Sequence, residues 1–454
     1  MEPKNKLEFR IEKDPLGEKQ VPADALYGVQ TMRARENFRI SRLRIHPQFY
    51  RGYFEIKRAA AEANMKTGKL DKMIGRAVVK AADELLAGRW ADQFDLDVFQ
   101  AGAGTSYNMN VNEVIANRAL EIIGSERGEH EVINPNDHVN KSQSTNDTMP
   151  TAMRITALRL LHPLCTALYD LASSFDAKGK EFANIKKSGR THLHDAIPMS
   201  LGDEFAGYGG NIRRAVDRVA AHETQLGEIP LGGTAVGDGT NADPKYAKLA
   251  VRALSDITGL RLTEAKNKVQ SQQSIGDFVA LSASIRCVCV ELMKIANDLR
   301  IMNSGPHTAL FEIELPAKQP GSSIMPGKVN PAMAEMMNMV CFHIGGHDQA
   351  ISACGEAGQL ELNVMMPYVA YALFESMEIL TNATATFDKE CVREIKANRE
   401  RLREFTKSTV GQAALLNEDV GFMRAAEVAM KAIEEKKTIK EIAREMKIPT
   451  DKLI

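Results

Sequence analysis

Residues 275–302 read IGDFVALSASIRCVCVELMKIANDLRIM. Apolar and small side chains recur every three or four residues along this stretch, as at Ile275, Phe278, Ile285 and Leu292. Such spacing places them on one face of an α-helix. An apolar helix face of this length is longer than a small globular domain needs for its core. The stretch therefore predicts one long helix of a helix bundle.

The same periodicity recurs before and after this stretch. It runs through residues 155–175 and 205–219, and further helices are predicted from Pro331 to about Cys354 and from Pro367 to about Val392. No alternating strand pattern persists, so the predicted fold class is all-α. The broad apolar faces indicate helices that pack on each other and on copies of the chain.

A loop rich in glycine and proline interrupts the helices at residues 321–331, which read GSSIMPGKVNP. Hydroxyl, amide and ammonium groups stand there among small and apolar side chains, which suits a lid over a small anion. A serine acts as a base only where dipoles and a cation hold its oxyanion. The backbone amides of residues 323–327, with Lys328, can supply that field.

Two further polar segments precede the long helices. Residues 102–110, GAGTSYNMN, lead into a helix predicted at 111–120, and such a turn is either an anion site or a plain helix cap. Residues 134–147, NPNDHVNKSQSTND, are too polar for a core, and their short donors can surround a carboxylate. His138 is interpreted as a surface or supporting imidazole, with membership of an accessory anion site as the alternative.

Two turn-rich segments also break the helical pattern. Residues 189–196 contain Thr191 and His192, which offer donors at a predicted helix junction, and residues 231–241 are rich in glycine. A satisfied structural histidine is the alternative interpretation of His192.

Charge and composition exclude several classes of partner. The 454 residues carry a net charge of −1, which argues against nucleic acid or an anionic membrane as a partner. Residues 1–6 lack an apolar leader and no apolar run reaches about 18 residues, so a cytoplasmic protein is expected.

Three domains are predicted, at 1–143, 144–395 and 396–454. The last is small and charged, with a helix at residues 438–446 and another beginning at Ile448. A structural cap is expected there rather than a DNA-binding helix-turn-helix.

The polar segments, in this order, resemble those of the fumarase/aspartase superfamily, whose members release fumarate by breaking a C–N or C–O bond beta to a carboxylate. The resemblance extends over nearly the whole chain. It implies three mostly helical domains and a homotetramer with a twenty-helix core, in which three subunits build each active site. No metal or organic cofactor is required for this chemistry.

The resemblance also implies residue roles. Ser322 matches the catalytic base, and His192 matches a catalytic histidine that Glu335 partners. The positions that match substrate-binding residues are Thr105, Ser106, Ser144, Thr145, Asn146, Thr191, Ser323, Lys328 and Asn330.

Short sequence segments indicate whether the predicted enzyme releases ammonia or water. Residues 100–106, 144–146 and 356–365 resemble the ammonia-lyase branch, whereas 147–148 and 231–237 resemble class II fumarases. The sequence therefore predicts an aspartate ammonia-lyase that converts L-aspartate to fumarate, with class II fumarate hydratase as the alternative.

The sequence departs from the family pattern at His194, Asp238 and His307. An N-substituted aspartate is therefore a further alternative for the substrate. An alternative of another class is a catalytically silent structural homotetramer. Retention of Ser322 and His192 argues against that alternative.

Overall fold

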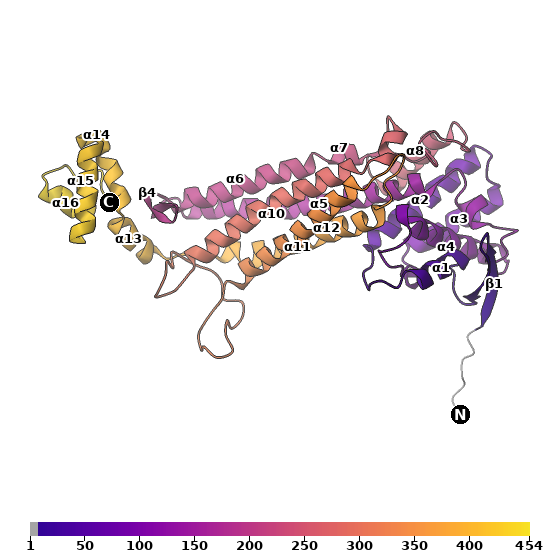
Figure 1. The fold of residues 1–454 in the computed structure, drawn as a ribbon, viewed down its shortest axis with the longest axis horizontal. Coiled ribbons are helices and arrows are strands. Elements are labelled where there is room, and N and C mark those ends of the chain that lie inside the picture. Colours follow the sequence, from indigo (N-terminus) through magenta and orange to yellow (C-terminus); the bar gives the residue numbers. More distant parts are fainter. Residues whose placement is uncertain (1–7) are drawn as a thin grey trace, which may run out of the picture. The chain divides into compact units, whose positions relative to one another are not determined.

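The computed structural model describes residues 8–454 (Figure 1). The stretch 1–6, expected to lack an apolar leader, lies outside the described residues. The chain divides into two compact units. The first unit comprises residues up to 164 with 218–286 and 344–379, and the second comprises 165–217, 287–343 and 380–454.

Long helices dominate both units, which confirms the predicted all-α class. The stretch quoted first forms α10, and the helices predicted near Pro331 and Pro367 are α11 and α12. The bounds of the long helices are α5 Thr145–Glu181, α6 Leu201–Ala220, α10 Gly276–Met302, α11 Ala332–Glu356 and α12 Met366–Glu390. Each contributes segments to both units.

The first unit surrounds an aromatic core. The Phe49 ring lies 5.2 Å from Tyr53, 5.3 Å from Tyr107 and 6.2 Å from Phe374, centroid to centroid. These contacts fix α4 against α2 and α12. The unit's other elements are β1 Phe9–Asp14, β2 Gly17–Pro22, α1 Val29–Asn37, α2 Pro47–Lys66, α3 Lys72–Leu86, α4 Thr105–Ile123, α7 Glu223–Leu226, β5 Glu228–Ile229, α8 Tyr246–Thr258, β6 Thr263–Glu264 and α9 Lys268–Gln273.

The second unit packs α5 on α6 through edge-to-face ring contacts, Phe182 on Phe205 at 5.2 Å and Phe175 on Tyr208 at 5.7 Å. Tyr208 also donates to Asp298 of α10. The unit's other elements are β3 Lys186–Thr191, β4 His194–Ser200, β7 Ile313–Glu314, β8 Lys396–Ala397, α13 Arg399–Ser408, α14 Asn417–Val420, α15 Phe422–Glu435 and α16 Ile439–Glu445.

Residues 186–200 form an antiparallel hairpin, β3–β4, rather than a turn between two helices. Thr191 pairs with His194, so His192 and Leu193 make a two-residue turn. Both have positive φ, 56° and 60°, as a type I′ turn requires. The expected helix junction at His192 is therefore wrong. Glycine or asparagine usually marks such turns, and neither is present.

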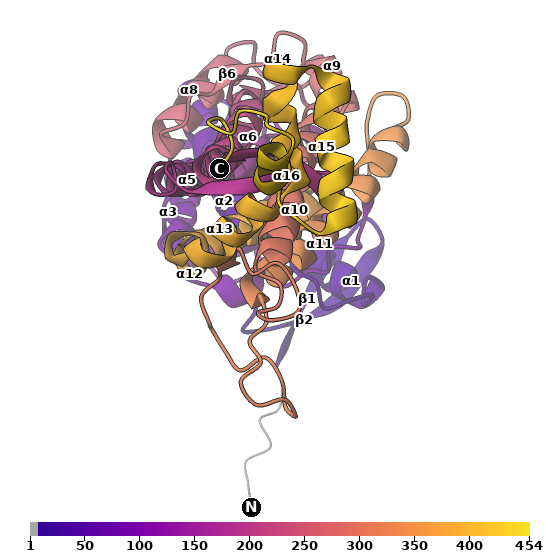
Figure 2. The same ribbon diagram turned by 90° about the vertical axis from the view of Figure 1, so that its left-hand side faces the viewer.

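The C-terminal helices α14, α15 and α16 pack together around a small apolar cluster (Figure 2). A capping box joins Thr438 and Glu441 at the start of α16. The helix predicted to begin at Ile448 is absent: Lys447 has positive φ and Pro449 lacks a backbone donor. Ile448 and Leu453 instead complete the apolar cluster.

Within residues 8–454, no helix combines the length and the apolar character that a membrane span requires. The three-domain division at residues 143 and 395 stays a prediction.

Candidate active site

The loop at residues 321–331 directs backbone amides at the hydroxyl of Ser322. The N–H groups of Ile324 and Met325 donate to Ser322 Oγ at 3.2 and 2.9 Å. Donors in these positions lower the free energy of a serine oxyanion. The arrangement is the one that the sequence suggested for the amides of residues 323–327.

The same loop closes on itself at its base. Gly321 N–H donates to the Lys328 carbonyl at 2.8 Å, and the Asn330 side-chain amide donates to the Gly321 carbonyl at 2.8 Å. A β-carbon at Gly321 would lie 2.7 Å from Asn330 N and Lys328 O, so only glycine fits without a shift. This closure brings Ser322, Ser323, Lys328 and Asn330 into one compact loop.

The start of α5 carries three predicted site residues, Ser144, Thr145 and Asn146. Ser144 caps the helix, because its Oγ accepts from the N–H of Asn146 at 3.2 Å. Asp147 completes a reciprocal pair by accepting the Ser144 N–H at 3.0 Å. The polar side chains are therefore fixed at a helix start, where the dipole favours an anion.

Asp147 also ties this helix start to the loop at residues 231–241. Its second carboxylate oxygen accepts the N–H groups of Gly232 and Thr234, both at 3.0 Å. The Asn146 amide donates to the Ala235 carbonyl at 2.8 Å. Burial raises the pKa of Asp147 to about 7, and the three backbone donors and the charge of Lys57 oppose that rise.

Lys57 supports the cluster from within the core. The side chain is fully buried, and its ammonium donates to Asn108, Asn140 and Gln143 at 2.7, 3.0 and 3.0 Å. Burial lowers its pKa to about 7, against the charge of Asp147. Three neutral acceptors match the three donors of an ammonium group.

The start of α4 completes this part of the site. Thr105 is its first residue, Gly104 before it has φ 81°, and no side chain caps the helix. The Asn108 amide, one turn into α4, donates to Thr145 Oγ at 3.1 Å. Thr105, Ser106 and Ser144–Asn146 thus lie on two joined helix starts in the first unit.

The second unit holds the remaining predicted residues. Thr191 and His192 are exposed at the tip of the β3–β4 hairpin, and Glu335 lies in the first turn of α11. Buried Glu312, in the chain before the 321–331 loop, pairs with Arg190 at 2.8 Å and Lys187 at 3.6 Å. The pairs tie the hairpin to the segment that leads into the loop.

Sequence reasoning overlooked Lys57, Asn108 and Asp147 as supports of the site. Lys57 stands in an ordinary helical pattern, so only its burial distinguishes it from a surface lysine. His138 Nδ1 accepts the Asn134 N–H at 2.9 Å within its own segment, and its role stays a prediction.

Replacing Lys57 tests this support. In Lys57→Met, Gln143 Oε1 loses its buried donor, and an unpaired buried acceptor costs about 1–3 kcal/mol. We expect a lower thermal midpoint and a lower urea midpoint than for Lys66→Met, an exposed lysine on the same helix. Equal midpoints for the two variants would contradict the supporting role of Lys57.

Comparisons with known proteins agree over almost the whole chain. A family model described as Lyase matches residues 17–346. An aspartate ammonia-lyase of a Bacillus species is 48% identical over 435 residues, 96% of this chain and 93% of the relative. A class II fumarate hydratase of Thermus thermophilus is 43% identical over 443 residues, 97% of this chain and 95% of the relative.

A solved structure gives the same result for the fold. The recombinant class II fumarase of Schistosoma mansoni superposes with a TM-score of 0.95 at 35% identity, over 98% of each chain. These matches confirm the resemblance that the polar segments indicated. The chain therefore belongs to this lyase family, the fumarase/aspartase superfamily.

Proposed function

We propose that the chain is an aspartate ammonia-lyase, which eliminates ammonia from L-aspartate to give fumarate. The observation that carries the proposal is the pair of backbone N–H groups directed at Ser322 Oγ. They supply what a serine base requires, in a chain of this lyase family. Relatives named aspartate ammonia-lyase, at 42% to 48% identity, support ammonia as the leaving group.

Ser322, as the oxyanion, takes a proton from the carbon beside the β-carboxylate of aspartate. The C–H electron pair moves into that carboxylate and forms an aci-carboxylate with a second negative charge. The pair then returns to form the C=C bond as the C–N bond breaks, and the protonated amino group, the ammonium, leaves as neutral ammonia. The abstracted proton stays on Ser322 Oγ until it passes to ammonia or water. Atoms and charge balance without an external oxidant or reductant.

The second negative charge is the costly part of this path. One preorganised donor that strengthens in the transition state contributes about 3 kcal/mol. Lys328 and Asn330 lie in the loop of Ser322 and bind a substrate carboxylate. Ser144–Asn146 and the uncapped start of α4 provide neutral donors, which hold charge without raising the net charge of the site.

Thr191 and His192 supply further substrate contacts, with Glu335 as the partner of the histidine. His192 stands in the exposed turn of the β3–β4 hairpin, which supports this role because its ring is accessible to a ligand. Its position at the end of a hairpin allows the imidazole to project toward a ligand.

The working form in this proposal is a homotetramer whose active sites take residues from different subunits. Exposed apolar side chains support it. In the 321–331 loop, Ile324 is 84% exposed, and on α11 Met339 and Phe342 are 64% and 67% exposed. Large apolar groups in such number indicate surfaces that another chain covers.

A substrate assay tests the activity. Aspartate is expected to produce ultraviolet absorbance of fumarate together with free ammonia, whereas malate should be turned over far more slowly. Faster turnover of malate would identify a class II fumarate hydratase instead. If the enzyme turns over only an N-substituted aspartate, then His194, Asp238 and His307, which depart from the family pattern, are assigned to the recognition of that substrate.

Ser322→Ala is the matched variant for that assay. Loss of a general base lowers turnover by about 10²–10⁴-fold, while loss of this half-buried loop hydroxyl changes stability by about 1 kcal/mol. The control is Ser173→Ala, an exposed serine whose hydroxyl donates to the Tyr169 carbonyl of its own helix. A Ser322→Ala enzyme as fast as wild type would remove Ser322 from the mechanism.

Mixed tetramers test the sharing of sites. In this experiment the Asn146→Ala chain and the Ser322→Ala chain are unfolded, mixed and refolded together. If Asn146 and Ser322 of one site come from different subunits, some sites in the mixed tetramers are intact and activity is measurable. Ser322→Ala mixed with Lys328→Ala is the control, because both lesions lie in one loop and no site escapes both. Recovery in neither mixture would contradict shared sites.

A further inference from the structure

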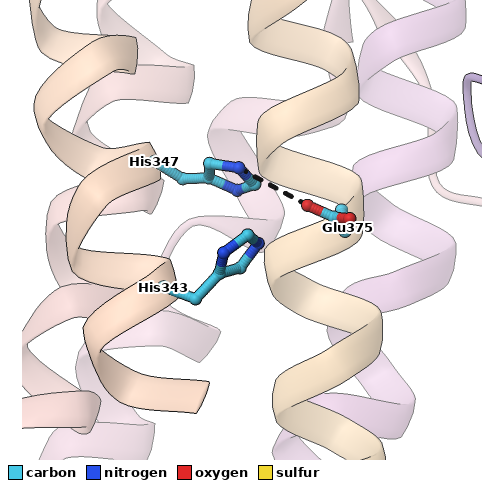
Figure 3. A group of neighbouring side chains, drawn as sticks. All are labelled: His343, His347 and Glu375. Carbon is cyan, nitrogen blue, oxygen red and sulfur yellow. Dashed lines mark ion pairs between the residues drawn. The ribbon is translucent and has the colours of Figure 1, made fainter. Parts of the chain in front are cut away.

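His343, His347 and Glu375 form a cluster that the proposed function does not use (Figure 3). The two histidines are four residues apart on α11, so their rings lie one turn apart on one helix face. Glu375 projects from α12 toward both rings. One ligand atom from each residue lies within 4.8 Å of the others.

A hydrogen bond fixes the protonation of the His347 ring. Its Nδ1 lies 3.1 Å from the Ala372 carbonyl oxygen and 3.2 Å from Ser376 Oγ. Because the Ser376 hydroxyl already donates to that carbonyl at 2.6 Å, both oxygens act as acceptors toward the ring, and Nδ1 carries a hydrogen. In the neutral ring the lone pair is then on Nε2. That atom faces Glu375 Oε2 at 3.4 Å. Two electron-rich atoms oppose each other unless a cation, either a proton or a metal ion, lies between them.

Glu375 is held in the same manner. Its other oxygen, Oε1, accepts the hydroxyl of Tyr371 at 3.0 Å, which leaves Oε2 directed at His347. Ligands of metal sites in proteins are oriented by such outer bonds, from imidazole N–H to carbonyl and from hydroxyl to carboxylate. Both partners here, Ala372 and Tyr371, come from α12.

We propose that α11 and α12 carry a site for a divalent transition-metal ion, with His343, His347 and Glu375 as its ligands. Two imidazoles and one carboxylate match zinc, whereas magnesium prefers an all-oxygen site. Zinc bonds of about 2.0–2.1 Å place tetrahedral ligand atoms about 3.3 Å apart, so modest side-chain rotation closes the cluster.

The ion would fasten two helices rather than take part in the elimination, since none of the three ligands is a predicted active-site residue. In the single chain His343 is exposed, while His347 and Glu375 are half-buried. A water molecule completes the fourth position. The competing state without metal is an ion pair between a protonated His347 and Glu375.

Titration of the metal-free full-length protein with zinc, followed by calorimetry, tests the site. Wild type is expected to bind one zinc ion per chain at the cluster, with a rise in thermal midpoint. His347→Ala and His343→Ala should each weaken binding by more than about 100-fold, beyond the usual effect of an outer partner. Cobalt(II) should give the visible absorption of a four-coordinate site in wild type and not in His347→Ala or His343→Ala.

Two further variants keep the test decisive if a ligand variant folds poorly. Tyr371→Phe removes only the outer hydroxyl and should weaken zinc binding by about 10-fold. His307→Ala removes an exposed histidine outside the cluster and should bind as wild type does. The proposal is overturned if wild type binds no zinc, or if His347→Ala and Tyr371→Phe both retain wild-type affinity.

Discussion

A dianion can be stabilised in this protein only by donors that are fixed before the substrate arrives. In the loop at residues 321–331 the same constraint applies to the proposed base, and two backbone N–H groups already point at Ser322 Oγ. At the start of α5 a cap fixes the polar side chains. Asp147 accepts one backbone N–H within that cap and two from the neighbouring loop at residues 231–241. Donors held in this way need no reorganisation as charge develops.

The fixed donors depend on charges buried beneath them. Lys57 and Asp147 are both fully buried, and each is surrounded by groups of the opposite polarity. A buried charge without such partners would be strongly destabilising, so the pair and its amides form one unit. The proposed site surface can then be built from neutral hydroxyls and amides, with Lys328 as the cation of the 321–331 loop.

Periodicity was sufficient to predict the long helices, and α11 and α12 begin within a residue of the expected prolines. The hairpin was missed because Lys186–Ser200 shows no alternation and its turn, His192-Leu193, contains no glycine. Lys57 was missed because burial is a tertiary property: the helix pattern around it also suits an exposed lysine. Polar composition marked each site segment, but only the structure shows that Asn108 joins the two helix starts.

The most direct measurement is the affinity for an analogue of aspartate with a nitro group in place of the β-carboxylate. Its ionised, planar nitronate resembles the aci-carboxylate, and its absorbance reports the bound form. The account predicts binding at least about 100-fold tighter than that of aspartate, as for transition-state analogues in general. An analogue bound no more tightly than aspartate would contradict a site built to hold the dianion.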